Sequence, residues 1–105
     1  MQGDGTSILM KLAEKVRNKY PQARVWLFGS HARGTATKES DLDICVVLPE
    51  VHPDDRLAVS DMAWEIGFDC DVHVSTIVVS ERDFEEGPVS SSPLVETIRT
   101  EGIAA

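Results

Sequence analysis

The chain has few cysteines and no long apolar run. Its 105 residues include only two cysteines, Cys45 and Cys70, and their wide spacing indicates neither a disulfide framework nor a CxxC zinc site. Both lie in apolar segments, so we expect free, buried thiols. No apolar stretch approaches the roughly 20 residues that a membrane-spanning helix needs, and the N-terminus lacks the basic and apolar pattern of a secretory signal. Together these absences predict a cytoplasmic protein without a membrane partner.

Basic residues are also scarce. The chain has 10 lysines and arginines against 18 aspartates and glutamates, which gives a formal net charge of −8 at pH 7. Such an acidic surface repels a phosphate backbone, so we expect no nucleic-acid partner. The hydrophobic content of 42% is that of an ordinary globular protein, and the length suits one domain. We therefore expect a single domain over residues 1–105, with its core at residues 6–103.

Apolar periodicity predicts an alternation of helices and strands. Helices are expected at residues 6–20, 29–34, 53–67 and 93–102, with Ser80 capping a further short turn. Strands are expected in the Val- and Ile-rich segments 23–28, 42–48 and 70–79. Residues 87–92 are expected to form a loose connection, and Trp26 and Trp64 to lie in the core. This order predicts an α/β fold with a mixed β-sheet flanked by helices.

The Gly29-Ser30 dipeptide follows a predicted strand and opens a predicted helix. Backbone N–H groups at such a turn bind anionic oxygens. Gly29 lets the backbone approach a ligand closely, and the Ser30 hydroxyl offers a further hydrogen bond. Arg33, one turn later, can reach the same anion with its forked guanidinium. An ordinary tight turn explains the dipeptide equally well, so the dipeptide alone leaves both interpretations open.

Two carboxylates, Asp41 and Asp43, stand at the head of the most strand-like segment. Residues two apart on a strand point to the same face, and like charges held so close repel unless a cation lies between them. Magnesium prefers one or two carboxylates together with substrate phosphates. Alternatively, Asp41 caps a loop and Asp43 points to solvent from an edge strand. Apolar residues on both faces of the segment favour metal binding, because an acid inside a buried strand needs a partner.

A two-metal transfer usually needs one more carboxylate, from a neighbouring strand. Alternation along the third predicted strand places Asp69, Asp71 and His73 on one face. Asp71, between Cys70 and Val72, is the predicted third acid, whereas Asp69 is assigned to the preceding turn. His73 is an alternative ligand or base, although a lone strand histidine is more often a packed or solvated bystander.

A long compound motif covers residues 29–34 and 40–43. It reads Gly-Ser-His-Ala-Arg-Gly and then Ser-Asp-Leu-Asp, and it resembles the signature of the minimal nucleotidyltransferases of the DNA polymerase beta superfamily. The segments 74–84 and 93–102 also resemble members of this family, so the resemblance covers most of the chain. It implies a nucleotidyltransferase fold, a mixed sheet with the site at one edge.

The resemblance also implies roles for the motif residues. Four of them would bind the nucleotide, with ATP as the expected substrate: Gly29, Ser30, Arg33 and Ser40. Three acids would bind two Mg²⁺ ions and support catalysis: Asp41, Asp43 and Asp71. The third acid would activate the acceptor hydroxyl, and the register of the resemblance also allows His73 in this place.

The expected partner follows from the same resemblance. Minimal nucleotidyltransferases are often paired with a helical HEPN-type protein as antitoxin and toxin, so we expect transfer of AMP from ATP to a hydroxyl, expected to be a tyrosine, of such a partner. Because the chain ends soon after the expected core, the acceptor site is expected to come from this partner or from a homo-oligomer. The alternatives are a non-catalytic antitoxin or regulator that binds nucleotide or partner, and transfer to a small molecule such as an aminoglycoside.

Overall fold

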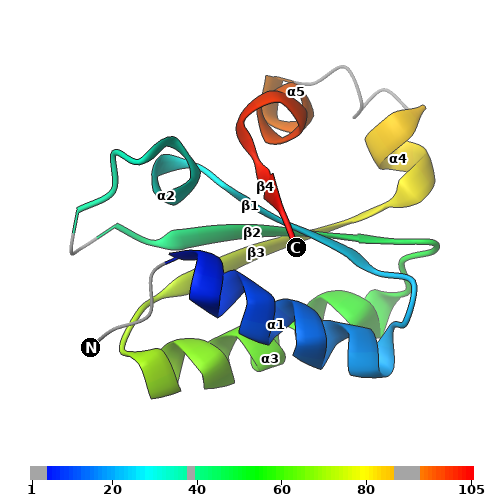
Figure 1. Cartoon of the computed structure of the whole chain (residues 1–105). Coiled ribbons are helices and arrows are strands. Elements are labelled where there is room, and N and C mark those ends of the chain that lie inside the picture. Colours follow the sequence, from blue (N-terminus) through cyan, green and yellow to red (C-terminus); the bar gives the residue numbers. More distant parts are fainter. Residues whose placement is uncertain (1–4, 38–39, 87–92) are drawn as a thin grey trace.

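A four-stranded mixed sheet with helices on both faces organises the protein (Figure 1). This computed structural model describes residues 5–37, 40–86 and 93–105. The strands are β1 (Arg24–Phe28), β2 (Leu42–Leu48), β3 (Val74–Ser80) and β4 (Ile103–Ala104). Their order across the sheet is β3-β2-β1-β4, with β1 antiparallel to β2 and β4, and β2 parallel to β3. The predicted α/β fold with a mixed sheet is confirmed, whereas β4 was not predicted.

The helices form two layers, one on each face of the sheet (Figure 1). The first layer contains α1 (Gly5–Lys19) and α3 (Pro53–Cys70). The second contains α2 (Ser30–Arg33), α4 (Glu81–Glu85) and α5 (Pro93–Glu101). Each layer buries its own apolar cluster against the sheet, so the sheet is covered on both sides, as its apolar central strand requires.

Strand β2 is the centre of the core. Ile44 and Val46 pack with the layer of α1 and α3, and Cys45 and Val47 pack with the layer of α4 and α5. All four side chains are fully buried, and burial of an aliphatic side chain of this size contributes about 1.5–3 kcal/mol to stability. Only Asp43 interrupts the buried pattern of this strand. The predicted two-sided apolar strand is therefore confirmed.

Several predicted helix ends are also confirmed. Ser80 caps α4, because its Oγ accepts a hydrogen bond of 3.0 Å from the Asp83 backbone N–H. Pro53 occupies the first turn of α3, where its missing N–H costs nothing. Helix α5 begins at Pro93 and ends before Gly102. The predicted loose connection at residues 87–92 lies outside the described part of the chain.

The end of α3 differs from the prediction. The helix continues past Gly67 to Cys70, and Asp71 caps it with a left-handed backbone, φ 56°. Gly67 is required for another reason: a β-carbon there would overlap the carbonyl oxygen of Val72, where the chain turns back towards β3. The Val72 N–H donates to the Gly67 carbonyl at 2.9 Å. The predicted third strand is confirmed, but its predicted start at residue 70 is wrong, because β3 begins at Val74.

Trp64 and Cys70, which were both predicted to be buried, lie nearer the surface. Trp64 is 66% exposed on α3, so its assignment to the core is wrong, whereas Trp26 packs beside Phe84 with ring centroids 6.1 Å apart. Cys45 is buried, and burial raises the pKa of its thiol to about 12. Cys70 is half-buried, so only one of the two free thiols is buried as predicted. Within the described residues, no helix is long and apolar enough to cross a membrane.

The contact at Gly67 makes a prediction about stability. Ala has the higher helix propensity by about 1 kcal/mol, yet Gly67→Ala should lower the free energy of unfolding by about 1–3 kcal/mol, because the added methyl displaces the Val72 backbone. Ser60→Ala, at an exposed position of the same helix, should change it by less than about 0.5 kcal/mol. Urea denaturation measures both, and stabilisation by Gly67→Ala would contradict the described turn.

Candidate nucleotide and metal site

Gly29 and Gly34 shape the loop that joins β1 to the short helix α2. Both glycines have φ +77°, a left-handed value that other residues adopt at a cost. The Gly29 carbonyl accepts hydrogen bonds from the backbone N–H groups of Ala32 and Arg33, each at 3.1 Å, and Gly34 caps α2 with its N–H directed to the Ser30 carbonyl. The structure therefore forms the tight turn and the short helix that the sequence predicts.

Gly29 lies directly against the carboxylate of Asp43. Phe28 and Asp43 are partners in the antiparallel ladder of β1 and β2, which brings the loop beside the carboxylate. A β-carbon at Gly29 would overlap the Asp43 Oδ2 atom. The predicted phosphate-binding loop and the predicted metal-binding acid are thus neighbours in space, although 14 positions separate them in the chain.

The carboxylates of Asp41 and Asp43 repel each other. The pKa of Asp43 is raised above its ordinary value of 3.8, first by burial and then by the negative charge of Asp41. The nearby charges of His31 and Arg33 act in the opposite direction without cancelling this effect. Two carboxylates that share one partly desolvated site provide the oxygen donors that Mg²⁺ prefers, and substrate phosphates usually supply further ligands. The residues present therefore fit a magnesium ion.

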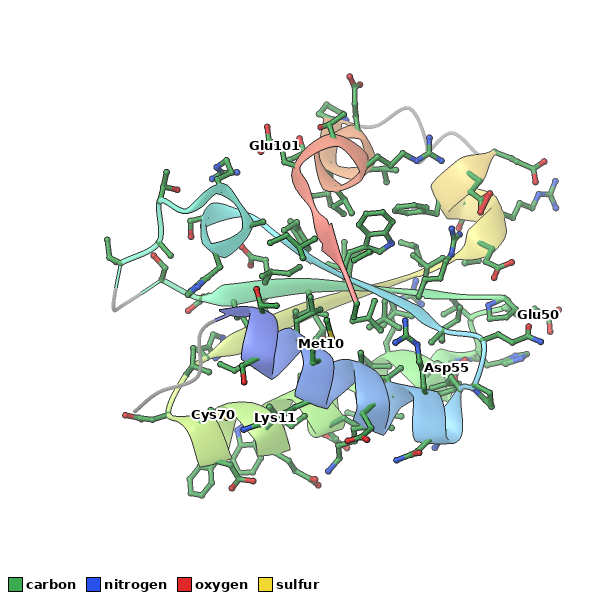
Figure 2. All side chains as sticks on the ribbon, viewed as in Figure 1. Met10, Lys11, Glu50, Asp55, Cys70 and Glu101 are labelled. Carbon is green, nitrogen blue, oxygen red and sulfur yellow. The ribbon has the colours of Figure 1, made fainter. Side chains whose placement is uncertain are left out.

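Arg33 lies between the loop and the last helix. Its Nη1 is 3.6 Å from Glu101 Oε1, and both side chains are about half exposed. Figure 2 shows Glu101 at the end of α5, on the side of that helix where α2 lies. An exposed ion pair of this kind contributes about 0–1 kcal/mol, so it leaves the guanidinium available to an anion. This contact was not predicted, since no periodic pattern connects residues so far apart in the chain.

Ser40 closes the loop that leads to Asp41. Its Oγ accepts a hydrogen bond of 2.9 Å from the Thr37 backbone N–H, and its carbonyl oxygen lies 3.2 Å from His31 Nε2. His31, to which the sequence gave little weight, therefore connects α2 to the segment that carries the carboxylates. The nucleotide-binding role of Ser40 stays a prediction, and the structure shows that the residue also shapes the loop.

The two candidates for the third catalytic position, Asp71 and His73, lie in different parts of the fold. Asp71 caps α3 and is not on a strand, so the alternation that placed it beside the other acids is wrong. The ladder pairs Leu42 with Val74, and the Leu42 N–H donates to the His73 carbonyl at 2.9 Å. Extending this parallel register by one residue places His73 beside Asp41. Among the residues that the structure describes, no three His, Cys, Asp or Glu side chains gather into a metal-binding group.

The described arrangement matches a known family. Residues 9–100 match the nucleotidyltransferase domain family, and the chain belongs to this family. A provisionally named protein adenylyltransferase of Methanocaldococcus jannaschii, MJ1305, is 33% identical over 82 residues, which are 73% of this chain and 56% of the relative. The chain thus spans about half the length of that relative.

Solved structures of toxin–antitoxin complexes have a similar fold. A chain of one such complex with AMP-PNP superposes with a TM-score of 0.60 at 25% identity, over 90% of this chain and 69% of the other. A chain in the complex of a tri-AMPylated Shewanella oneidensis HEPN toxin with an MNT antitoxin gives 0.58 at 22% identity, over 95% and 70%. The nucleotidyltransferase fold predicted from the motif is therefore confirmed.

The two glycines provide an informative pair of substitutions. Gly34→Ala imposes a left-handed strain of about 1–2 kcal/mol and meets open space. Gly29→Ala places alanine at φ 77° and ψ −156°, a conformation that essentially glycine alone adopts, and also pushes a methyl group into Asp43. We expect Gly29→Ala to weaken binding of Mg²⁺ and AMP-PNP by at least about tenfold and Gly34→Ala by less than about threefold. Calorimetric titration of both variants measures this, and equal losses would contradict the contact.

The raised pKa of Asp43 predicts an effect of Mg²⁺ on stability. The unfolded chain releases this proton near pH 3.8 and the folded chain only at higher pH, so the ionised carboxylate lowers stability at pH 7. Without metal, Asp43→Asn should therefore raise the melting temperature. Millimolar Mg²⁺ should stabilise the unaltered protein and the exposed control Asp61→Asn, but not Asp43→Asn. Thermal unfolding at pH 7 tests this, and an equal Mg²⁺ response in all three would refute it.

Proposed function

We propose that this protein transfers AMP from ATP to a hydroxyl group of a protein partner, as the antitoxin of a HEPN/MNT-type pair. The observation that carries the proposal is the contact between Gly29 and the Asp43 carboxylate, because it places a backbone that can receive phosphate against an acid that can hold Mg²⁺. Membership of the nucleotidyltransferase family supports the reaction class. The name of the archaeal relative and the AMPylated toxin in the similar complex support protein as the acceptor.

The proposed roles follow the positions of the side chains. Gly29 and Ser30 receive the triphosphate, Arg33 exchanges its exposed contact with Glu101 for a phosphate oxygen, and Asp41 and Asp43 hold the metal. Two Mg²⁺ ions bound there would neutralise charge on the reacting phosphate and align the attacking oxygen. The protein contributes mainly position and a fixed charge pattern, which is where catalysis of phosphoryl-type transfer originates.

The transfer is a substitution at the α-phosphorus of ATP. The acceptor oxygen forms a bond to this phosphorus, the bond from phosphorus to the bridging oxygen breaks, and pyrophosphate leaves. The acceptor hydroxyl also loses its proton to a base. His73 is our candidate for the base, since it is in register with Asp41, whereas Asp71 belongs to the helix cap.

The second candidate function is a binding module that holds nucleotide or partner without turnover. The observation that favours it is the histidine in the place where the resemblance implies a third acid. The site would then still bind Mg²⁺ and ATP through Asp41 and Asp43, but the acceptor hydroxyl would lack a carboxylate to activate it. Transfer to a small molecule such as an aminoglycoside has no particular support from the described residues.

Labelled ATP decides between these functions. The protein is incubated with α-³²P-ATP, Mg²⁺ and a candidate HEPN-type partner protein, and label on that protein is measured. Under the proposal, the partner gains AMP, and Asp43→Asn lowers the rate by at least about a hundredfold. Nucleotide binding without any label on the partner would reject the transferase and favour the binding module.

Two further substitutions test the third position in the same assay. If His73 occupies it, His73→Asp should preserve or increase the labelling rate and His73→Ala should reduce it by about 10²–10⁴-fold. Asp71→Asn should then change the rate by less than about threefold, because Asp71 caps α3 through its backbone N–H, which asparagine retains. Loss of labelling in Asp71→Asn together with normal labelling in His73→Ala would restore Asp71 as the third acid.

A further inference from the structure

Helix α3 presents an apolar stripe to solvent. Leu57, Trp64 and Phe68 are spaced by seven and four positions, so they share one face of the helix. Their exposed fractions are 65%, 66% and 74%. The opposite face carries Val59 and Ala63, which are buried against the core. Helix α3 is thus apolar on both sides, and only one of these sides is covered within the described structure.

The two aromatic side chains of this stripe form a flat platform. The rings of Trp64 and Phe68 are stacked, with centroids 5.4 Å apart and an angle of 14° between their planes. Large exposed apolar patches on a folded protein are typical of interaction sites, and Trp is among the residues that contribute most to binding at protein interfaces. The two rings are mostly exposed and contribute little to the core, so this face is a candidate binding surface.

A groove lies beside this platform, on the face of the sheet that α3 covers. It has a volume of about 430 Å³ and is lined in part by Trp64, Phe68, Asp71 and His73. His73 is one of its lining residues, and extension of the β2–β3 register places His73 beside Asp41. Figure 1 shows that α3 ends at the side of the sheet where β2 begins, on the face opposite α2. Asp43 shares a strand face with Cys45 and Val47, which pack in the layer of α4 and α5. A partner seated in the groove would therefore lie at the same end of the sheet as the carboxylates but on the opposite face.

The charges around the stripe define its occupant. Asp61 lies on the same helix face, between Leu57 and Trp64, and Asp71 lines the groove. Arg56 is the only basic residue of α3, and its guanidinium donates to the Val78 carbonyl at 3.3 Å. Lys15, from the neighbouring helix, is paired with Glu65 at 2.5 Å. The apolar platform therefore has a surround of negative charge, in a chain of net charge −8.

We propose that the α3 stripe and groove dock an amphipathic helix of the acceptor protein, with an apolar face and a basic rim. Charge complementarity selects a basic segment, and it opposes a second copy of this chain, because two acidic faces would repel each other. The stripe positions match the way a helix lies along an apolar groove. The link to acceptor delivery depends on the proposed function, whereas the docking itself does not.

A designed peptide tests the docking without nucleotide. The probe is a fluorescein-labelled helical peptide of about 18 residues with leucines along one face and lysines on the other. Its matched controls are the same peptide with every lysine replaced by glutamate, and a scrambled peptide without an apolar face. Fluorescence anisotropy with the full chain should show binding of the basic peptide alone, and this binding should weaken as salt is added.

Matched variants locate the surface. Trp64→Ser combined with Phe68→Ser should weaken peptide binding by at least about tenfold. Met10→Ser combined with Leu94→Ser removes two exposed apolar side chains elsewhere, 50% and 45% exposed, and should change binding by less than about twofold. Asp61→Lys should weaken the basic peptide and improve the acidic one.

Three outcomes would overturn the proposal. Equal binding of the acidic peptide would reject charge selection, and full binding by the Trp64→Ser/Phe68→Ser protein would reject the surface. Dimerisation of the unaltered chain that is lost in that variant, measured by sedimentation, would make a second copy the occupant. Because AMP-PNP binding and labelling are measured separately, a failed transferase with intact docking is distinguishable from failed docking with intact nucleotide binding.

Discussion

The contact between the Gly29 backbone and the Asp43 carboxylate is the constraint on which the rest of the site depends. The antiparallel pairing of β1 and β2 imposes it, because Phe28 and Asp43 are partners in that ladder. Burial of β2 on both faces then fixes the position of Asp43, since any shift of the strand would move four fully buried side chains. The core therefore holds a backbone conformation that glycine alone readily adopts against a partly desolvated acid, and the burial of that acid costs stability.

Local chemistry made most of the fold predictable. The apolar run of β2, the proline starts of α3 and α5 and the Ser80 cap each depend on neighbouring residues, and the structure confirms them. The glycine turn and the short helix α2 were predictable for the same reason, because adjacent positions carry them. Asp41 and Asp43 also lie near each other, since the charge of Asp41 raises the pKa of Asp43.

Long-range contacts account for what the sequence could not reveal. Gly67 resembled a helix end, but its role is to admit the Val72 carbonyl, a contact that depends on how the chain turns back. The error moved the start of the third strand and placed Asp71 on it. Trp64 was assigned to the core because its neighbours are apolar, yet α3 has two apolar faces and the sheet can cover only one.

The two thiols differ in a way that makes the protein convenient for spectroscopy. With a pKa of about 12, the buried Cys45 has almost no thiolate at neutral pH. Cys70 is half-buried and lies at the end of α3 (Figure 2), one residue before the groove residue Asp71. A maleimide dye or spin label should therefore attach to Cys70 in preference to Cys45, without mutagenesis. Such a probe would report on the groove from a single labelled position, because the buried Cys45 would stay unlabelled.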